Sequence, residues 1–153
     1  MSEPISSLAS VITIAGSATE SIKMLLIFFH RFRNAPARVH HWLTMLESLH
    51  STLSSLQQCG RSLDPRYRFS SHFQQRLLSC VTQLQICTSE VARIDAELGQ
   101  ASSNGKKKWD HKARRSWERA KWAIVGGHKM KKVMETMKLY HFEFVMELLK
   151  VLL

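Results

Sequence analysis

The sequence predicts an all-α fold, an up-and-down bundle of four to five helices. Its 153 residues contain only six glycines and three prolines, and the prolines lie at or near the ends of long periodic stretches. Within those stretches apolar residues recur at alternating intervals of three and four, as on one face of a helix. A chain of this length with 44% hydrophobic residues can bury one core, so we expect a single domain over residues 1–153.

The first predicted helix runs from about Ser6 to Arg33 and is apolar around most of its circumference. A helix with this pattern must be buried on several sides. In its middle, the small residues of Ala15–Ala18 permit close contact with another helix. The residues that we single out as a surface for a membrane or a protein partner are Leu8, Val11, Ile12, Ile14, Leu25, Leu26, Ile27 and Phe28.

The second and third predicted helices each carry a heptad seam, over about Ala37–Cys59 and about Ser70–Leu98. Joined by a loop that contains Gly60 and Pro65, they are expected to pack as an antiparallel pair. The first seam consists of Val39, Trp42, Leu46, Leu49, Leu53 and Leu56. The second consists of Phe73, Leu77, Cys80, Leu84, Cys87, Val91, Ile94 and Leu98.

Beyond the third helix we expect a polar break over Gln100–Lys108, a short fourth helix from about Asp110 to Val125, and a fifth over Met130–Leu153. The fifth helix has its own seam of Met130, Val133, Met137, Tyr140, Phe144, Leu148 and Val151. Because the chain is still apolar where it stops, we interpret it as the front part of a longer protein.

The positive charge is concentrated in one segment of the chain. Residues 106–138 hold twelve Lys or Arg against three acidic residues, a balance of +9 out of the total +10. A basic patch for an anionic surface is predicted at Lys106, Lys107, Lys108, Lys112, Arg114, Arg115, Arg119 and Lys121. Three interpretations stay open: a solvated face outside a core stripe that contains Trp109 and Trp117, attraction to anionic lipid, and, least favoured, nucleic-acid binding.

Sequence signatures of catalysis and of cofactor binding are lacking, so we predict that the domain is not an enzyme. The glycine-containing segment Gly99–Lys107 departs from a phosphate-binding loop in its spacing and does not follow a strand. The eight histidines form no pair with metal-ligand spacing, and candidate nucleophiles and bases sit inside heptads. We therefore expect no metal, no cofactor and no small-molecule substrate, but protein partners or self-association.

The start of the chain and its cysteines indicate a cytoplasmic protein that is recruited to a membrane if at all. No basic residue precedes Lys23, and Glu20 and Lys23 interrupt the apolar run, so neither a signal peptide nor a conventional membrane span is predicted. Cys80 and Cys87, seven residues apart on one helix, are too distant for a disulfide and are expected in the core.

The order of these segments resembles a known fungal domain. The resemblance rests on Ile12–Ala18, on Asn34-Ala35-Pro36 before a leucine-rich helix, and on Arg119–Ala123 leading to Lys129, Val133, Met137, Leu139 and Tyr140. The chain is similar over its whole length to the N-terminal domain found before NACHT-type STAND modules and ankyrin repeats. That domain is related to HeLo-like helical domains and is also named after the azaphilone pigment cluster protein L.

The resemblance implies a helical bundle that serves as the signalling or effector part of an intracellular receptor-like protein. Some relatives cause regulated cell death by inserting their first helix into a membrane. The first helix here has only Gly16, where a membrane-active glycine zipper has several glycines at helical spacing. Two alternatives remain open: a helical scaffold for protein interaction or oligomerisation, and a basic nucleic-acid-binding domain.

Overall fold

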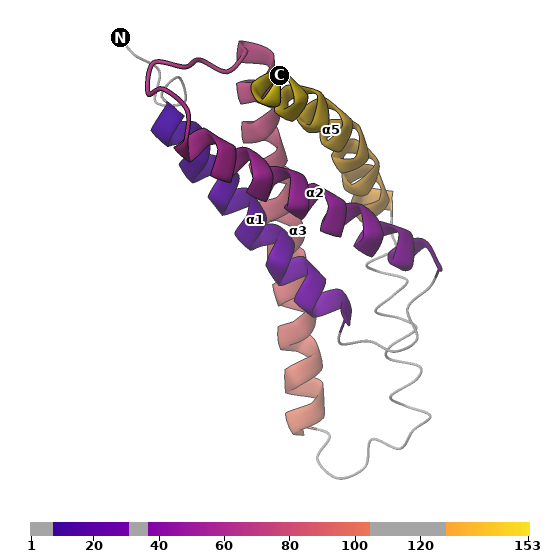
Figure 1. The fold of residues 1–153 in the computed structure, drawn as a ribbon. Coiled ribbons are helices and arrows are strands. Elements are labelled where there is room, and N and C mark those ends of the chain that lie inside the picture. The colour runs from indigo at the N-terminus through magenta and orange to yellow at the C-terminus, as the bar shows by residue number, and fades with distance from the viewer. Residues whose placement is uncertain (1–7, 31–36, 105–127) are drawn as a thin grey trace.

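The computed structural model describes residues 8–30, 37–104 and 128–153, which form four α-helices (Figure 1). These are α1 (Leu8–His30), α2 (Ala37–Arg61), α3 (Ser71–Asn104) and α5 (His128–Leu152). Successive helices alternate in direction, so the predicted all-α, up-and-down bundle is confirmed. The predicted fourth helix lies outside the described residues.

The heptad seams form the core. In α2 and α3 every seam residue whose side chain is described is buried, from Val39 to Leu56 and from Phe73 to Val91. In α5, Met130, Met137, Tyr140 and Phe144 are buried, whereas Val133, Leu148 and Val151 are half-buried. An aromatic cluster joins α3 to α5, with the Phe73 and Phe144 rings edge to face and their centroids 5.4 Å apart.

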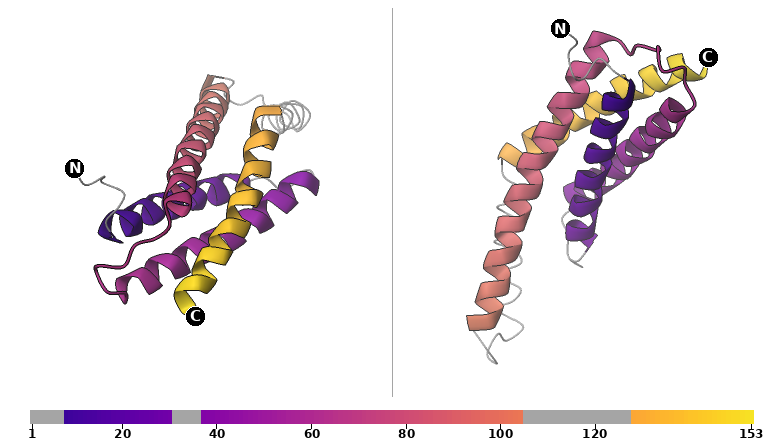
Figure 2. Two further views of the ribbon diagram at one scale, coloured as in Figure 1. Left: turned by 90° about the horizontal axis from the view of Figure 1, so that it is seen from above. Right: turned by 90° about the vertical axis from the view of Figure 1, so that its left-hand side faces the viewer.

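The neighbours of α2 and α3 differ from the prediction. Each of these two helices packs against both α1 and α5, and among the described residues α2 and α3 barely touch each other. The expected antiparallel pair of α2 and α3 is therefore wrong. The apolar surface of α1 extends far enough around the helix to bury part of both seams, and α5 covers the rest; Figure 2 shows α1 and α2 crossed by α3 and α5.

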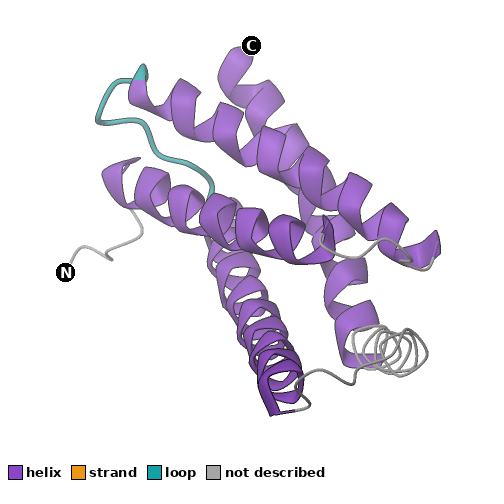
Figure 3. Cartoon of the chain, turned by 90° about the horizontal axis from the view of Figure 1, so that it is seen from below, coloured by secondary structure: helices purple, strands orange, loops and turns teal. Residues whose placement is uncertain are grey.

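Helix α3 begins at a side-chain cap and continues further than predicted. The backbone N–H of Phe73 donates to Ser70 Oγ at 3.2 Å, and the short loop from α2 enters the helix there (Figure 3). The break predicted from Gln100 is wrong in its position, because α3 continues to Asn104. One glycine costs a helix only about 1 kcal/mol, so Gly99 does not end a helix that about five turns of buried seam, from Phe73 to Val91, already hold.

Candidate interaction surfaces

The eight predicted residues of the first helix are distributed around α1. Leu8, Val11, Leu25 and Phe28 are buried in the core, Ile12, Ile14 and Leu26 are half-buried, and Ile27 is 52% exposed. Next to Ile27, Met24 is also exposed, although it is not one of the eight residues of the predicted interaction surface. The eight residues therefore do not form one exposed surface, because four lie in the core, three are half-buried and only Ile27 is in solvent.

Small residues let α1 and α2 approach closely at two points. A side chain on Gly16 would meet the Gln57 amide, which lies above this glycine and donates from Nε2 to the Ile12 carbonyl oxygen at 3.4 Å. A Cβ atom on Gly60 would lie 3.0 Å from Ile12 Cγ1. In the small-residue segment Ala15–Ala18, Ala15 and Ala18 are buried as well, whereas Ser17 is exposed.

An apolar groove opens between α1 and α3 near the C-terminal end of α1. Met24, Ile27 and Phe28 form one wall, and Thr88 and Val91 of α3 form the other. This groove lies beside the segment Met24–Phe29, in which six successive residues are apolar. An apolar surface thus continues from the core to solvent at this end of α1.

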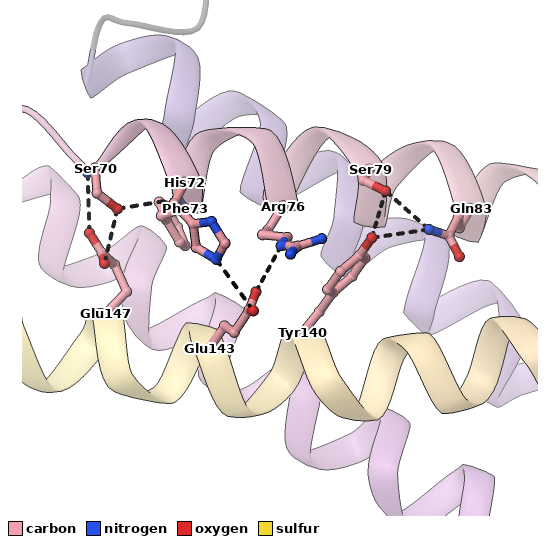
Figure 4. A network of polar contacts seen from close by, with 9 residues as sticks. All are labelled: Ser70, His72, Phe73, Arg76, Ser79, Gln83, Tyr140, Glu143 and Glu147. Atoms are coloured by element: carbon pink, nitrogen blue, oxygen red, sulfur yellow. Dashed lines mark hydrogen bonds and ion pairs between the residues drawn. The ribbon is translucent and has the colours of Figure 1, made fainter.

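Unlike α1, which packs mainly through apolar side chains, α5 also contacts α3 through a row of polar side chains (Figure 4). At the start of α3, the buried Glu147 carboxylate accepts hydrogen bonds from the backbone N–H of Ser70 at 3.4 Å and from its hydroxyl at 3.5 Å. A negative charge is favourable at this place because the N-terminus of a helix carries a partial positive charge.

Glu143 forms the middle of the row. Its Oε1 atom lies 3.3 Å from His72 Nε2, and its Oε2 atom lies 3.2 Å from Arg76 Nε. The latter two atoms are close enough for an ion pair but are not aligned as a hydrogen bond, and neither has a hydrogen-bond partner among the described residues. The Arg76 guanidinium also lies over the Tyr140 ring, 5.5 Å from its centroid.

Tyr140 completes the row one helical turn away. Its hydroxyl lies 2.7 Å from Ser79 Oγ, and the Gln83 amide donates to both oxygens, at 3.3 Å and 3.0 Å. Since the tyrosine is buried, these bonds replace the water that its hydroxyl has lost. The face of α5 that meets α3 is therefore specified by polar partners as well as by apolar packing.

Two titratable groups with shifted pKa values lie on these helices, the buried Cys80 and the half-buried His141. Burial raises the pKa of the Cys80 thiol to about 12, and its Sγ lies 3.6 Å from Met137 Sδ. Burial lowers the pKa of His141, whose Nε2 is 3.1 Å from Thr52 Oγ1 on α2. The thiolate form is disfavoured, so Cys80 is a poor nucleophile and acts as a core residue, as predicted.

The outer face of α5 is a surface that the sequence analysis missed. On the side away from the core, Leu139, Phe142, Met146 and Leu149 are exposed, together with Leu152 and Leu153 at the end of the chain. The signal was present in the sequence, because the first four alternate in spacing by three and four. The inner seam of the same helix is enough to explain a core helix, so the sequence pattern alone does not call for a second apolar face.

The remaining predictions concern a basic patch, metal binding and membrane insertion. The basic patch Lys106–Lys121 lies outside the described residues. Among the residues that are described, no three His, Cys, Asp or Glu side chains are grouped so as to hold a metal ion. Within the same residues, α1 is long and apolar enough to cross a membrane, a property that core helices of soluble proteins share.

Comparison with known proteins identifies a family for this chain. Residues 2–152 match the family described as pigment biosynthesis cluster protein PigL N-terminal. No curated protein and no solved structure matches the chain. The family agrees with the one that the order of segments resembles, and it covers almost the entire chain.

Proposed function

The chain belongs to the PigL N-terminal family, and on this basis we propose that it is a non-enzymatic signalling or effector domain of an intracellular receptor-like protein. Helix α1 is the effector element. In the resting bundle α1 is packed against α2 and α3, and on activation it leaves them and enters an anionic membrane, which leads to regulated cell death.

The observation that carries this proposal is the apolar character of the contacts that hold α1. Most of its buried side chains are apolar, such as Leu8, Val11 and Ile22. Its buried polar side chains are Thr19 and Ser21, and the Thr19 hydroxyl donates to the Gly16 carbonyl oxygen of the same helix. Helix α5, in contrast, is held to α3 by carboxylates and hydroxyls in addition to apolar packing. Lipid can replace an apolar contact at little cost, but it cannot replace a hydrogen-bonded carboxylate. Of these two helices, α1 is therefore the one whose contacts a bilayer can substitute.

The distribution of charge within α1 indicates which end enters the membrane. Glu20 and Lys23 are exposed near the middle of the helix, and each costs about 3 kcal/mol at the centre of a bilayer. From Met24 to Phe29 every residue is apolar. We expect this end to penetrate the hydrocarbon while Glu20 and Lys23 stay among the headgroups, and the basic patch Lys106–Lys121 to add attraction to anionic lipid.

Leakage of dye from anionic vesicles tests the proposal with a matched pair of variants. Ile27 on α1 and Ile86 on α3 are both exposed, at 52% and 44%, so Ile27→Asp and Ile86→Asp leave the core intact. We expect Ile27→Asp to abolish leakage and Ile86→Asp to leave it unchanged, with equal helix content by circular dichroism. Equal leakage by both variants contradicts a role for α1.

A second function, a scaffold for oligomerisation without membrane activity, is favoured by a separate observation. The outer face of α5 exposes apolar residues along the length of the helix from Leu139 onward. Contiguous exposed apolar surface on a soluble domain is typical of a protein-interaction site. A vesicle-indifferent protein that self-associates supports this function and opposes the first.

A further inference from the structure

The outer face of α5 has the spacing of a coiled-coil seam. Leu139, Phe142, Met146, Leu149 and Leu153 follow one another at intervals of three, four, three and four residues. The first four are between 44% and 66% exposed, and Leu153 is fully exposed. The buried residues of the same helix, such as Met137 and Phe144, lie on the opposite side. Helix α5 is thus apolar on two opposite faces, of which the core uses one.

We propose that this outer face binds a second copy of the same chain, with the two α5 helices antiparallel about a two-fold axis. The inference rests on the oligomerisation function proposed above and is independent of α1. A seam with alternating spacing of three and four requires another helix with the same repeat, and a second α5 supplies one. The two domains then lie on opposite sides of the helix pair, because each core is on the far side of its own α5.

The antiparallel direction follows from the residues that precede the stripe. The same spacing, continued backwards from Leu139, reaches Glu135 and Lys132, both exposed. A parallel pair would place each of these charges against its own copy, which is unfavourable at seam positions. In the antiparallel pair Met146 lies on the two-fold axis, and Leu139 lies opposite Leu153 of the second copy, so that like charges do not meet.

The residues beside the stripe are complementary in this arrangement. Glu143 lies three residues before Met146, so it faces Leu149 of the second copy and lies next to Lys150 of that copy. The two-fold axis repeats this pair of opposite charges. Lys150 is 69% exposed and its Nζ is 4.0 Å from Glu147, whereas Glu143 keeps its contacts with His72 and Arg76. On the other flank, Val145 and Leu152 extend the apolar contact.

The size of the stripe sets the expected affinity. It spans fifteen residues, or about 21 Å of helix, and two copies bury on the order of 1,000 Å² in total, the lower limit for a specific interface. The helix is already folded within the bundle, so association does not cost the ordering of α5. We therefore expect a dimer with Kd of about 1–100 μM, which exchanges readily with the monomer.

Sedimentation equilibrium of the 153-residue chain, of mass 17.6 kDa, over a wide concentration range tests the proposal. We expect a monomer–dimer equilibrium that Phe142→Lys weakens by about tenfold or more, since each dimer contains the change twice. Ile86→Lys, on an exposed site of α3, is the matched control and should leave the equilibrium unchanged. A dimer that survives Phe142→Lys overturns the α5 interface but not oligomerisation, whereas a monomer at every concentration overturns both.

Cysteine cross-linking then tests the direction. In a Cys59→Ser background, a mixture of Leu139→Cys and Leu153→Cys chains should form the mixed disulfide on mild oxidation, because these positions face each other across copies. Leu139→Cys alone should remain uncross-linked, and Met146→Cys alone should cross-link to itself. Efficient self-cross-linking of Leu139→Cys overturns the antiparallel arrangement.

Discussion

At the scale of single residues, the contact of α1 with α2 depends on the absence of a side chain at Gly60. Ile12 Cγ1 occupies the space that a side chain at this position would take, only 3.0 Å from the place of its Cβ atom. Carbon atoms pack at about 3.5–4.0 Å, so a larger residue at position 60 must push α1 away. The same small gap lets Gln57 reach the Ile12 carbonyl one turn earlier on α2.

Gly60→Val should destabilise the bundle by about 1–3 kcal/mol, the usual cost of overpacking a close helix contact. Urea unfolding followed by circular dichroism measures this loss. Ile12→Ala removes the atom that clashes, so the double variant Ile12→Ala/Gly60→Val should lose less stability than the two single changes added together. Strict additivity would contradict the proposed clash.

A second prediction at this scale concerns His141 and the pH dependence of the free energy of unfolding. Burial lowers its pKa from the ordinary value of 6.5, so the unfolded chain binds the proton more readily than the folded one. The contribution of His141 to stability is therefore present above pH 6.5 and is lost as the pH falls through the folded pKa. His141→Gln should reduce the loss of stability between pH 7 and pH 5, measured as the shift of the urea midpoint relative to the unchanged protein. An identical pH dependence in the two proteins would show that His141 is not involved.

At the scale of elements, the polar row between α3 and α5 fixes how these two helices lie against each other. Apolar seams tolerate small rotations and shifts, whereas Glu147 with Ser70, Glu143 with Arg76, and Tyr140 with Ser79 require one register. Helix α1 is held mainly by apolar packing and by few such polar contacts. We therefore propose that α1 is the helix that leaves the bundle.

Tyr140→Phe should destabilise the protein by about 1 kcal/mol, because Ser79 and Gln83 lose a buried partner. A double-mutant cycle with Gln83→Ala, measured by chemical denaturation, separates this contact from the general effect of each change. We expect a coupling of about 0.5 kcal/mol or more. A coupling near zero would mean that the Gln83–Tyr140 hydrogen bond contributes nothing to the α3–α5 contact.

The elements themselves follow from the sequence, but their neighbours do not. Heptad spacing identifies the inner face of α2, α3 and α5, and residues such as Leu46, Leu84 and Phe144 are buried as expected. The spacing says nothing about which helix covers a seam, so the expected contact of α2 with α3 was wrong. It also does not give the rotation of α1, which decides that Leu8 lies in the core and Ile27 in solvent.

At the scale of the whole molecule, the described helices present two separate apolar surfaces. One surrounds Met24 and Ile27 at the end of α1, and the other follows the outside of α5. Of the first surface only Ile27 was among the predicted residues, and the second was not predicted because one seam already explained α5. A folded domain with both surfaces suits a signalling module that self-associates through α5 and acts through α1.

The central claim is that α1 must leave α2 before the domain acts on a membrane. The structure offers a reversible lock at this contact, where Ile12 Cγ1 lies 3.0 Å from the place of a Cβ atom at position 60. Since Cγ1 is one carbon–carbon bond, about 1.5 Å, from the Cβ of Ile12, the two Cβ atoms are at most about 4.5 Å apart, which a disulfide can span. We would prepare Ile12→Cys/Gly60→Cys in a Cys59→Ser background and compare dye leakage from anionic vesicles for oxidised and reduced samples of the same protein. The account predicts no leakage while the disulfide holds α1 against α2, and leakage after reduction. Equal leakage in the two states, with the disulfide confirmed by mass spectrometry, would contradict it.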